Sequence, residues 1–298
     1  MMRKILLIIN IAINCLLFAD PLFLLTDPKT HFSIELYTNK LQLSIFQPFF
    51  YSSVPIDLLI DQGDDSSILK GLISVESAFF IHAVSEKGAM GLTQMMPSTA
   101  YELGVLNAFN PFQALDGAKL YLNKLQERFG KIDYALSAYY EGPSKVSLYG
   151  PSEEGRKYSQ KVIEESKKFK DNQVFIRDVF YLQPHISVGK ELNDLSAGLN
   201  FVNSFLGIVD FQGGFDISAG EFSHYFFAYP RISHSLSLIF GEKNLELVAG
   251  ISYTKLPNFG VELLLNSNYF DISIKFKLWQ VIFSAGWSSE GLHLGVIK

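Results

Sequence analysis

Apolar and polar residues alternate one by one through most of the chain after about residue 171. In the clearest stretch, polar residues stand between Phe270, Ile272, Ile274 and Phe276. Successive side chains of a β-strand point to opposite faces, so a period of two puts the apolar residues on one face. Turn-forming residues separate such stretches at 241–244, 266–268 and 288–291. We therefore predict about six to nine antiparallel strands between Phe175 and Ile297, in a separate all-β domain over residues 169–298.

Two architectures fit this β domain, a small outer-membrane barrel and a soluble β-sandwich or half-barrel. A positive mean hydropathy and 26 phenylalanines favour the membrane only weakly. Residues 31–50 also alternate, on either side of Thr38-Asn39-Lys40, and predict a β-hairpin within a connector of residues 20–54. If this hairpin pairs with the C-terminal strands, the residues between them are an insertion into one sheet.

Residues 55–168 carry helical spacing instead and predict an all-α domain, so the fold class is α+β. Asn110 before Pro111 predicts an N-cap followed by proline at the first helical position, and Gly130 predicts the end of that helix. Thr99 to Glu102 has the spacing of a capping box. The other predicted helices cover residues 67–80, 133–140 and 152–170.

Glu76 is the most informative single residue. It stands near the end of the first of these helices, one step from an apolar face formed by Leu69, Leu72 and Ile73. Apolar surroundings disfavour a charged carboxyl, so its pKa rises and it can donate a proton near neutral pH. A single glutamate on a helix is more often only a solvent-facing charge.

The residues around Glu76 form an ordered set of motifs that extends over residues 55–168. The set resembles the soluble lytic transglycosylase family, whose catalytic domain has the goose-type lysozyme-like fold and which cleaves peptidoglycan. Its members here are Glu76-Ser77, Ala83-Val84-Ser85, Gly88-Ala89, Gly91-Leu92, Gln94, Met96-Pro97, Asn110-Pro111, Gly117, Tyr121-Leu122, Ala138-Tyr139, Gly142-Pro143 and Tyr158 near Lys161-Val162.

The resemblance implies a reaction with a single acid at the MurNAc-GlcNAc β-1,4 bond. Glu76 protonates the glycosidic oxygen, and as its conjugate base it helps the muramic 6-hydroxyl to attack the anomeric carbon, which gives a 1,6-anhydro product. The resemblance also implies that Ser85, Gln94, Met96, Tyr139 and Tyr158 bind the substrate or shape the site. Without it, Met96 is more simply a core residue, and Ser85 and Gln94 are ordinary loop residues.

One departure leaves other functions open. Where the family has Ala-Tyr-Asn-Ala-Gly, this chain has Ala138-Tyr139-Tyr140-Glu141-Gly142. Glu141 as a second carboxylate would favour a muramidase-type hydrolase. The altered segment is also compatible with a noncatalytic peptidoglycan-binding or tethering protein. A third alternative makes the β domain the functional part, as a pore or assembly factor.

Residues 1–19 predict a secretory signal peptide, with Arg3 and Lys4 before a short apolar run. The chain would then be exported to the periplasm, with outer-membrane association through the β domain. The single cysteine, Cys15, would instead carry a lipid if the chain were a lipoprotein, although Asn14 fits that signal poorly. A net charge of −5 argues against nucleic acid as a partner. The six histidines are scattered, so we predict no metal or cofactor.

Overall fold

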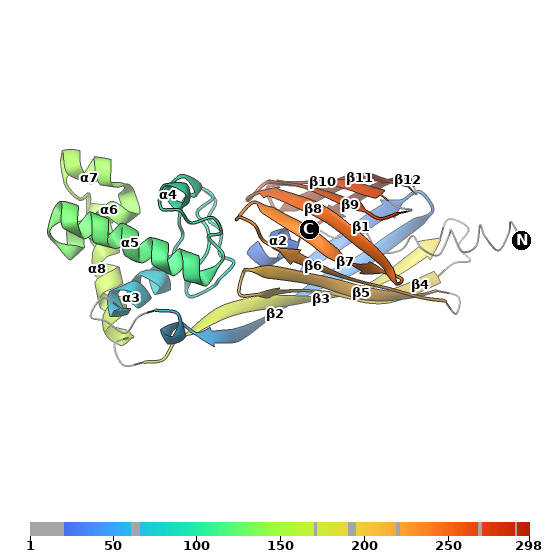
Figure 1. Ribbon diagram of the computed structural model, residues 1–298, viewed down its shortest axis with the longest axis horizontal. Helices are drawn as coiled ribbons and strands as arrows, with labels where there is room; N and C mark the ends of the chain where they lie inside the picture. Colours follow the sequence, from blue (N-terminus) through green and yellow to red (C-terminus); the bar gives the residue numbers. More distant parts are fainter. Residues whose placement is uncertain are drawn as a thin grey trace, which may run out of the picture. The chain divides into compact units, whose positions relative to one another are not determined.

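The computed structural model describes residues 21–60, 66–169, 172–189, 195–218, 221–267, 270–289 and 291–298. The predicted signal peptide and Cys15 lie outside these residues. The chain divides into two compact units (Figure 1). One comprises the chain up to Phe50 together with Val179–Lys298, and the other comprises Tyr51–Asp178.

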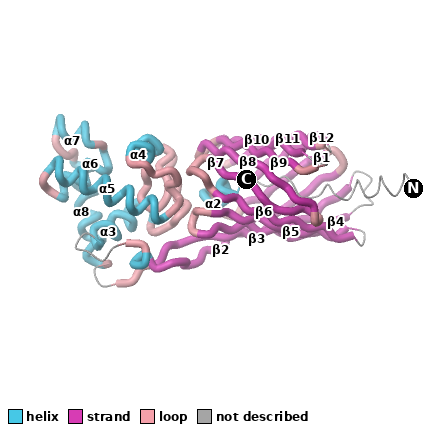
Figure 2. The backbone as a smooth tube through the Cα atoms, in the orientation of Figure 1, coloured by secondary structure: helices cyan, strands magenta, loops and turns pink. Residues whose placement is uncertain are grey.

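The first unit is a closed antiparallel barrel in which each strand pairs with its neighbours in the chain and β1 pairs with β12 (Figures 1 and 2). Ten strands follow residue 171 among the residues that the structure describes, so the prediction of six to nine was wrong. Several strands are only seven or eight residues long, with turns too short to be counted from the pattern. The strands are β1 (His31–Tyr37), β2 (Lys40–Pro55), β3 (Phe175–Gly189), β4 (Leu195–Phe205), β5 (Val209–Ser218), β6 (Glu221–Pro230), β7 (Leu236–Lys243), β8 (Glu246–Lys255), β9 (Phe259–Leu265), β10 (Phe270–Leu278), β11 (Val281–Ser288) and β12 (Gly291–Ile297).

Closure of the sheet excludes the sandwich, and the β unit does not simply follow the helical one. The hairpin of β1 and β2 belongs to the same barrel as the C-terminal strands. The helical unit is therefore inserted between β2 and β3. Because the strands are antiparallel, β2 ends and β3 begins at the barrel rim where β1 begins and β12 ends.

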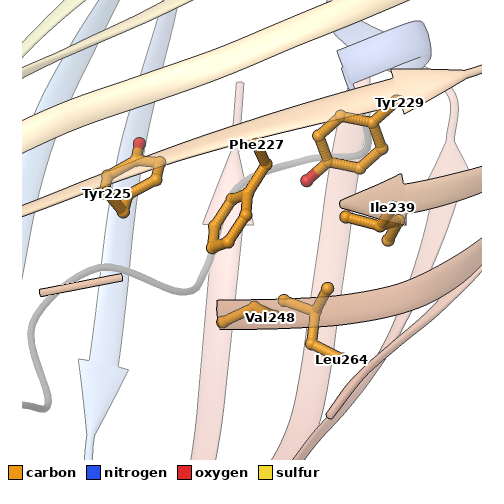
Figure 3. Packing of buried hydrophobic residues seen from close by; sticks show 6 residues of the cluster. All are labelled: Tyr225, Phe227, Tyr229, Ile239, Val248 and Leu264. Carbon is orange, nitrogen blue, oxygen red and sulfur yellow. The ribbon is translucent and has the colours of Figure 1, made fainter. Parts of the chain in front are cut away.

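The barrel turns its apolar side chains outwards and its polar side chains inwards. On β10, Ile272, Ile274 and Phe276 are exposed, whereas Asp271 and Lys275 are buried. The pattern is the same on β1, β2 and β12. An apolar cluster also lines the inside of β6 to β9, formed by Tyr225, Phe227, Tyr229, Ile239, Val248 and Leu264 (Figure 3).

A short apolar helix, α2 (Pro21–Thr26), lies inside the barrel (Figure 1). It contacts β4 and β5, while Phe23 lies against Gly260 of β9. These strands are far apart in the barrel order, so a six-residue helix touches all of them only from the inside. Asp27 ties the segment to the wall, because its carboxylate accepts from Lys277 Nζ at 2.6 Å and its carbonyl accepts from the Tyr181 hydroxyl at 2.8 Å.

The second unit is helical, and the helix ends predicted from the sequence are confirmed in part. Asn110 caps α5 by accepting from the amides of Phe112 and Gln113, and Gly130 ends α5 in the left-handed conformation, as predicted. The capping box at Thr99 was wrong, because α4 already begins at Pro97 after Met96. The helices are α3 (Ser66–Ser77), α4 (Pro97–Glu102), α5 (Pro111–Phe129), α6 (Ile132–Glu141), α7 (Pro143–Tyr149) and α8 (Glu153–Lys168), with a 3₁₀ turn at Ile56–Leu58. No helix among the described residues is long and apolar enough to cross a membrane.

Candidate active site

Close packing of α3 against α8 brings the central residues of the site together. A Cβ atom on Gly71 of α3 would lie 2.5 Å from the Val162 carbonyl oxygen and 2.7 Å from the Ser166 amide nitrogen. Only a residue without a side chain fits there. Ala78 and Phe79 follow with φ of 49° and 64°, so α3 ends directly after Glu76 and Ser77.

Glu76 is held by Tyr158, 82 positions further along the chain. The Tyr158 hydroxyl donates a hydrogen bond to Glu76 Oε1. Burial raises the pKa of Glu76, while the Tyr158 hydrogen bond and the positive charge of Lys161 lower it, and the result lies above the ordinary value. The same burial, with the charge of Glu76, raises the pKa of Tyr158. Tyr158 therefore acts as a neutral donor to a carboxyl that binds its proton more tightly than an exposed glutamate does.

Tyr139 is the second tyrosine near the acid. Its hydroxyl donates to the Thr93 carbonyl oxygen at 2.9 Å, which fixes α6 to the loop that precedes α4. Burial and the negative charge of Glu76 raise the pKa of Tyr139. The structure thus brings Glu76, Tyr139 and Tyr158 together, and their roles in the reaction stay predictions.

Ser85 and Gln94 form hydrogen bonds within their own loop. Ser85 Oγ accepts from the Ala89 amide at 2.9 Å. Gln94 has φ of 47°, and its side-chain amide donates to the carbonyls of Ala83 and Gly91, both at 3.0 Å. Both side chains therefore close the loop, and their contact with a substrate stays a prediction.

Contact between Met96 and the substrate also stays a prediction. Met96 stands at the N-cap position of α4, with 40% of its surface exposed. An exposed methionine is available to a ligand, whereas the core role considered above does not fit this exposure.

Glu141 is engaged elsewhere. Its Oε2 pairs with Lys145 Nζ at 2.8 Å, and its Oε1 accepts from the Ser152 amide at 2.9 Å. The side chain is only 5% exposed. Burial raises the pKa of Glu141, but the bonds from Lys145 and Ser152 outweigh that effect and hold the pKa below its usual value. Glu141 thus links α6 to the start of α8, which is a structural role.

Two residues of the site were not predicted from the sequence. The Ser77 hydroxyl donates to the Leu92 carbonyl oxygen at 2.8 Å and so joins the end of α3 to the loop. Tyr140 stacks on Tyr158, with ring centroids 4.7 Å apart and an angle of 16° between the planes. Ser77 stands in the Glu76-Ser77 motif, which gave a signal for it, whereas Tyr140 was noticed only as a departure.

The loop after α3 is joined to the first residues of β3. The Arg177 amide donates to the Phe79 carbonyl at 2.8 Å, and the Ile81 amide donates to the Arg177 carbonyl at 3.1 Å. His82 Nε2 lies 3.1 Å from Asp178 Oδ1, and both side chains are buried. No group of His, Cys, Asp and Glu suited to a metal ion occurs among the residues that the structure describes. These bonds join the loop beside Glu76 to the start of β3.

Residues 59–162 match the family model described as "Transglycosylase SLT domain". The helical segment thus resembles a transglycosylase SLT domain. All six predicted site residues lie inside the matched range. The chain is 37% identical over 83 residues to the "Transglycosylase" of Enterobacteria phage PRD1, a match that covers 28% of this chain and 31% of the phage protein. The chain thus aligns with about a third of that relative's length.

Two solved structures show a partial likeness. An inactive mutant of the lytic transglycosylase Slt from Pseudomonas aeruginosa has 26% identity, covers 34% of this chain and 20% of its own, and gives a TM-score of 0.31. The KdgM porin in complex with disordered oligogalacturonate has 14% identity, covers 40% of this chain and 81% of its own, and gives a TM-score of 0.28. Both scores are low, and the functional argument depends on the SLT domain and its geometry.

Proposed function

We propose that the chain is a peptidoglycan lytic transglycosylase in which Glu76 is the only catalytic carboxylate. The observation that carries the proposal is the buried Glu76 carboxyl with a raised pKa and a tyrosine donor on one oxygen. Lys161 and Tyr158 are the groups that act on its pKa, and no second carboxylate is among them within the described residues. A single carboxyl at the glycosidic bond fits cleavage in which no second carboxylate activates a water molecule.

The proposed reaction needs one proton carrier. Protonated Glu76 donates to the glycosidic oxygen between MurNAc and GlcNAc as the bond from that oxygen to C1 breaks. The carboxylate of Glu76 then accepts the proton of the muramic 6-hydroxyl, while the oxygen of that hydroxyl forms a bond to C1. A 1,6-anhydro end forms, Glu76 returns to its protonated state, and no water is consumed. Tyr158 stabilises the carboxylate between the two steps.

Mass spectrometry of the products tests this reaction. The full chain in detergent would digest purified peptidoglycan beside Glu76→Gln and Glu141→Gln. We expect anhydromuramic ends from the wild type and from Glu141→Gln, and none from Glu76→Gln. Reducing ends that disappear in Glu141→Gln would establish a hydrolase instead. No products from any of the proteins, with glycan binding retained, would establish a binding protein.

We also propose that the barrel anchors the domain in an outer membrane. Outward apolar residues and inward polar residues are the arrangement that lipid requires of a barrel. Both tryptophans are exposed near opposite ends of β11, Trp279 in the turn before it and Trp287 within its last two residues. Aromatic residues at both interfaces are typical of such barrels.

The strand order makes the orientation testable. The SLT domain must meet peptidoglycan, so the rim with the β2–β3 connection faces the periplasm. Turns such as β8–β9 then face the periplasm, and turns such as β7–β8 face outwards. In intact cells and a Cys15→Ser background, an impermeant maleimide should label Leu245→Cys in the outer turn and not Asn258→Cys in the inner one. Labelling of Asn258→Cys and not of Leu245→Cys in intact cells would contradict the proposal. So would a failure of both cysteines to react after the cells are opened.

A further inference from the structure

Tyr140 presents an exposed aromatic ring next to Tyr158, the hydrogen-bond donor to Glu76. One face of the ring is covered by Tyr158, which itself donates a hydrogen bond to Glu76. In spite of this stacking, 53% of Tyr140 is exposed. With one ring face against Tyr158, this exposure leaves the opposite face as the surface that a ligand could cover.

We propose that the exposed face of Tyr140 is a stacking platform for a pyranose ring of the glycan strand. This inference rests on the proposed function. A pyranose presents a face of C–H bonds, which is apolar and slightly positive, and the face of a phenol ring is apolar and negative. A stacked sugar would cover the aromatic face and lie next to the sugar whose bond Glu76 cleaves. Tyr140 would then position the substrate and would not act in proton transfer.

The surroundings of Tyr140 do not give its ring a structural role in the core. The buried residues of α6 are Ala135, Leu136, Ser137 and Ala138, and Tyr140 is outside that set. Tyr140 also stands where the family pattern noted above has an asparagine, which has no aromatic ring. The platform would therefore be a feature by which this chain holds its glycan differently from the family pattern.

Kinetics on soluble, uncrosslinked glycan strands test the platform, with the full chain in detergent. We expect Tyr140→Ala to raise KM about three- to tenfold and to change kcat less than about twofold, because an aromatic contact acts on bound sugar before and during the reaction. Tyr140→Phe should stay within about twofold of the wild type, since its ring face is intact. Tyr149→Ala is the matched control, because Tyr149 is 83% exposed on the same unit and makes no stack with Tyr158.

A role through Tyr158 predicts different results. If Tyr140 only holds Tyr158 in place, Tyr140→Ala would lower kcat and move the pH profile while KM stays constant, and the platform would be overturned. Binding of the same strands to Glu76→Gln, measured by calorimetry, separates this proposal from the proposed function. Binding weakened by Tyr140→Ala supports the platform even if the wild type releases no anhydro product. Equal binding with and without the Tyr140 ring overturns it.

Discussion

At the scale of single residues, the chemistry depends on opposing effects on one carboxyl. Burial favours the neutral form of Glu76, and the Tyr158 hydroxyl and Lys161 favour the charged form. Both forms are needed in turn if the residue is first an acid and then a base. The net pKa lies above the ordinary value, so the acid is present to higher pH than an exposed glutamate would allow.

Tyr158→Phe tests this balance. It removes a hydrogen bond that lowers the pKa of Glu76, so the alkaline limb of kcat/KM should move to higher pH. At the optimum, kcat should fall about ten- to a hundredfold, because a hydrogen bond to a charged group contributes about 1.5 to 3 kcal/mol. The measurement is a pH profile with soluble glycan, and Tyr149→Phe is the control. An unmoved limb would show that Tyr158 does not act on the acid.

Glu76→Gln makes a second prediction, on stability. A carboxyl whose folded pKa is raised ionises more readily in the unfolded chain, so its stabilising contribution is complete below the unfolded pKa and is lost as pH rises towards the folded value. Gln does not ionise and can still accept from Tyr158. We therefore expect Glu76→Gln to have a higher Tm than the wild type at pH 7 and an equal Tm near pH 4. A lower Tm at pH 7 would contradict the raised pKa.

The sequence pattern selects candidate site residues but cannot give their contacts. Glu76, Tyr139 and Tyr158 follow from a motif pattern, and the structure brings them together. The stacking of Tyr140 on Tyr158 could not be predicted, because it depends on how α6 and α8 pack. Nor could the pattern show that Glu141 would be held by Lys145 and the Ser152 amide.

At the scale of helices, local signals were reliable where a cap is a local contact. Asn110 and Gly130 act on amides or carbonyls within a few residues, so the sequence alone identifies the bounds of α5. The helix α7 was not predicted, because its seven residues between Gly142 and Gly150 are too few to show a helical period. Gly71 gave no signal at all, since its role depends on the approach of α8.

Gly71→Ala is the prediction at this scale. Its methyl group would meet the backbone of α8, so α3 and α8 must separate and the contact between Glu76 and Tyr158 weakens. We expect a loss of about 1 to 3 kcal/mol in stability, from overpacking, and a fall in activity per folded molecule. Asn110→Ala is the matched control, because loss of the cap costs about 1 kcal/mol without touching the site. Equal activity of the two variants would contradict the role of Gly71.

At the scale of the whole molecule, the sequence predicted strands but not which face is inside. Alternation gives two faces to each strand, and the direction of the apolar face depends on whether a closed sheet is surrounded by water or by lipid. Closure requires β1 to meet β12 across almost the whole chain, which no local pattern records. Polar residues on the inner side of β3 and β5, such as His185 and Asp216 at 2.7 Å, pair with one another there and are buried.

The helix inside the barrel leads to the last prediction. The side chains of α2 from Leu22 to Leu25 are buried, and Asp27 is bound to Lys277, so the segment should fill this part of the lumen as a stable plug. In a Cys15→Ser background, Leu25→Cys should resist a soluble maleimide in detergent until the protein is denatured. Leu58→Cys, at a position 74% exposed, should react at once and serves as the control. A plugged barrel should also give no conductance steps in a planar bilayer. Rapid labelling of Leu25→Cys together with steady conductance would instead show an open pore and a mobile N-terminal segment.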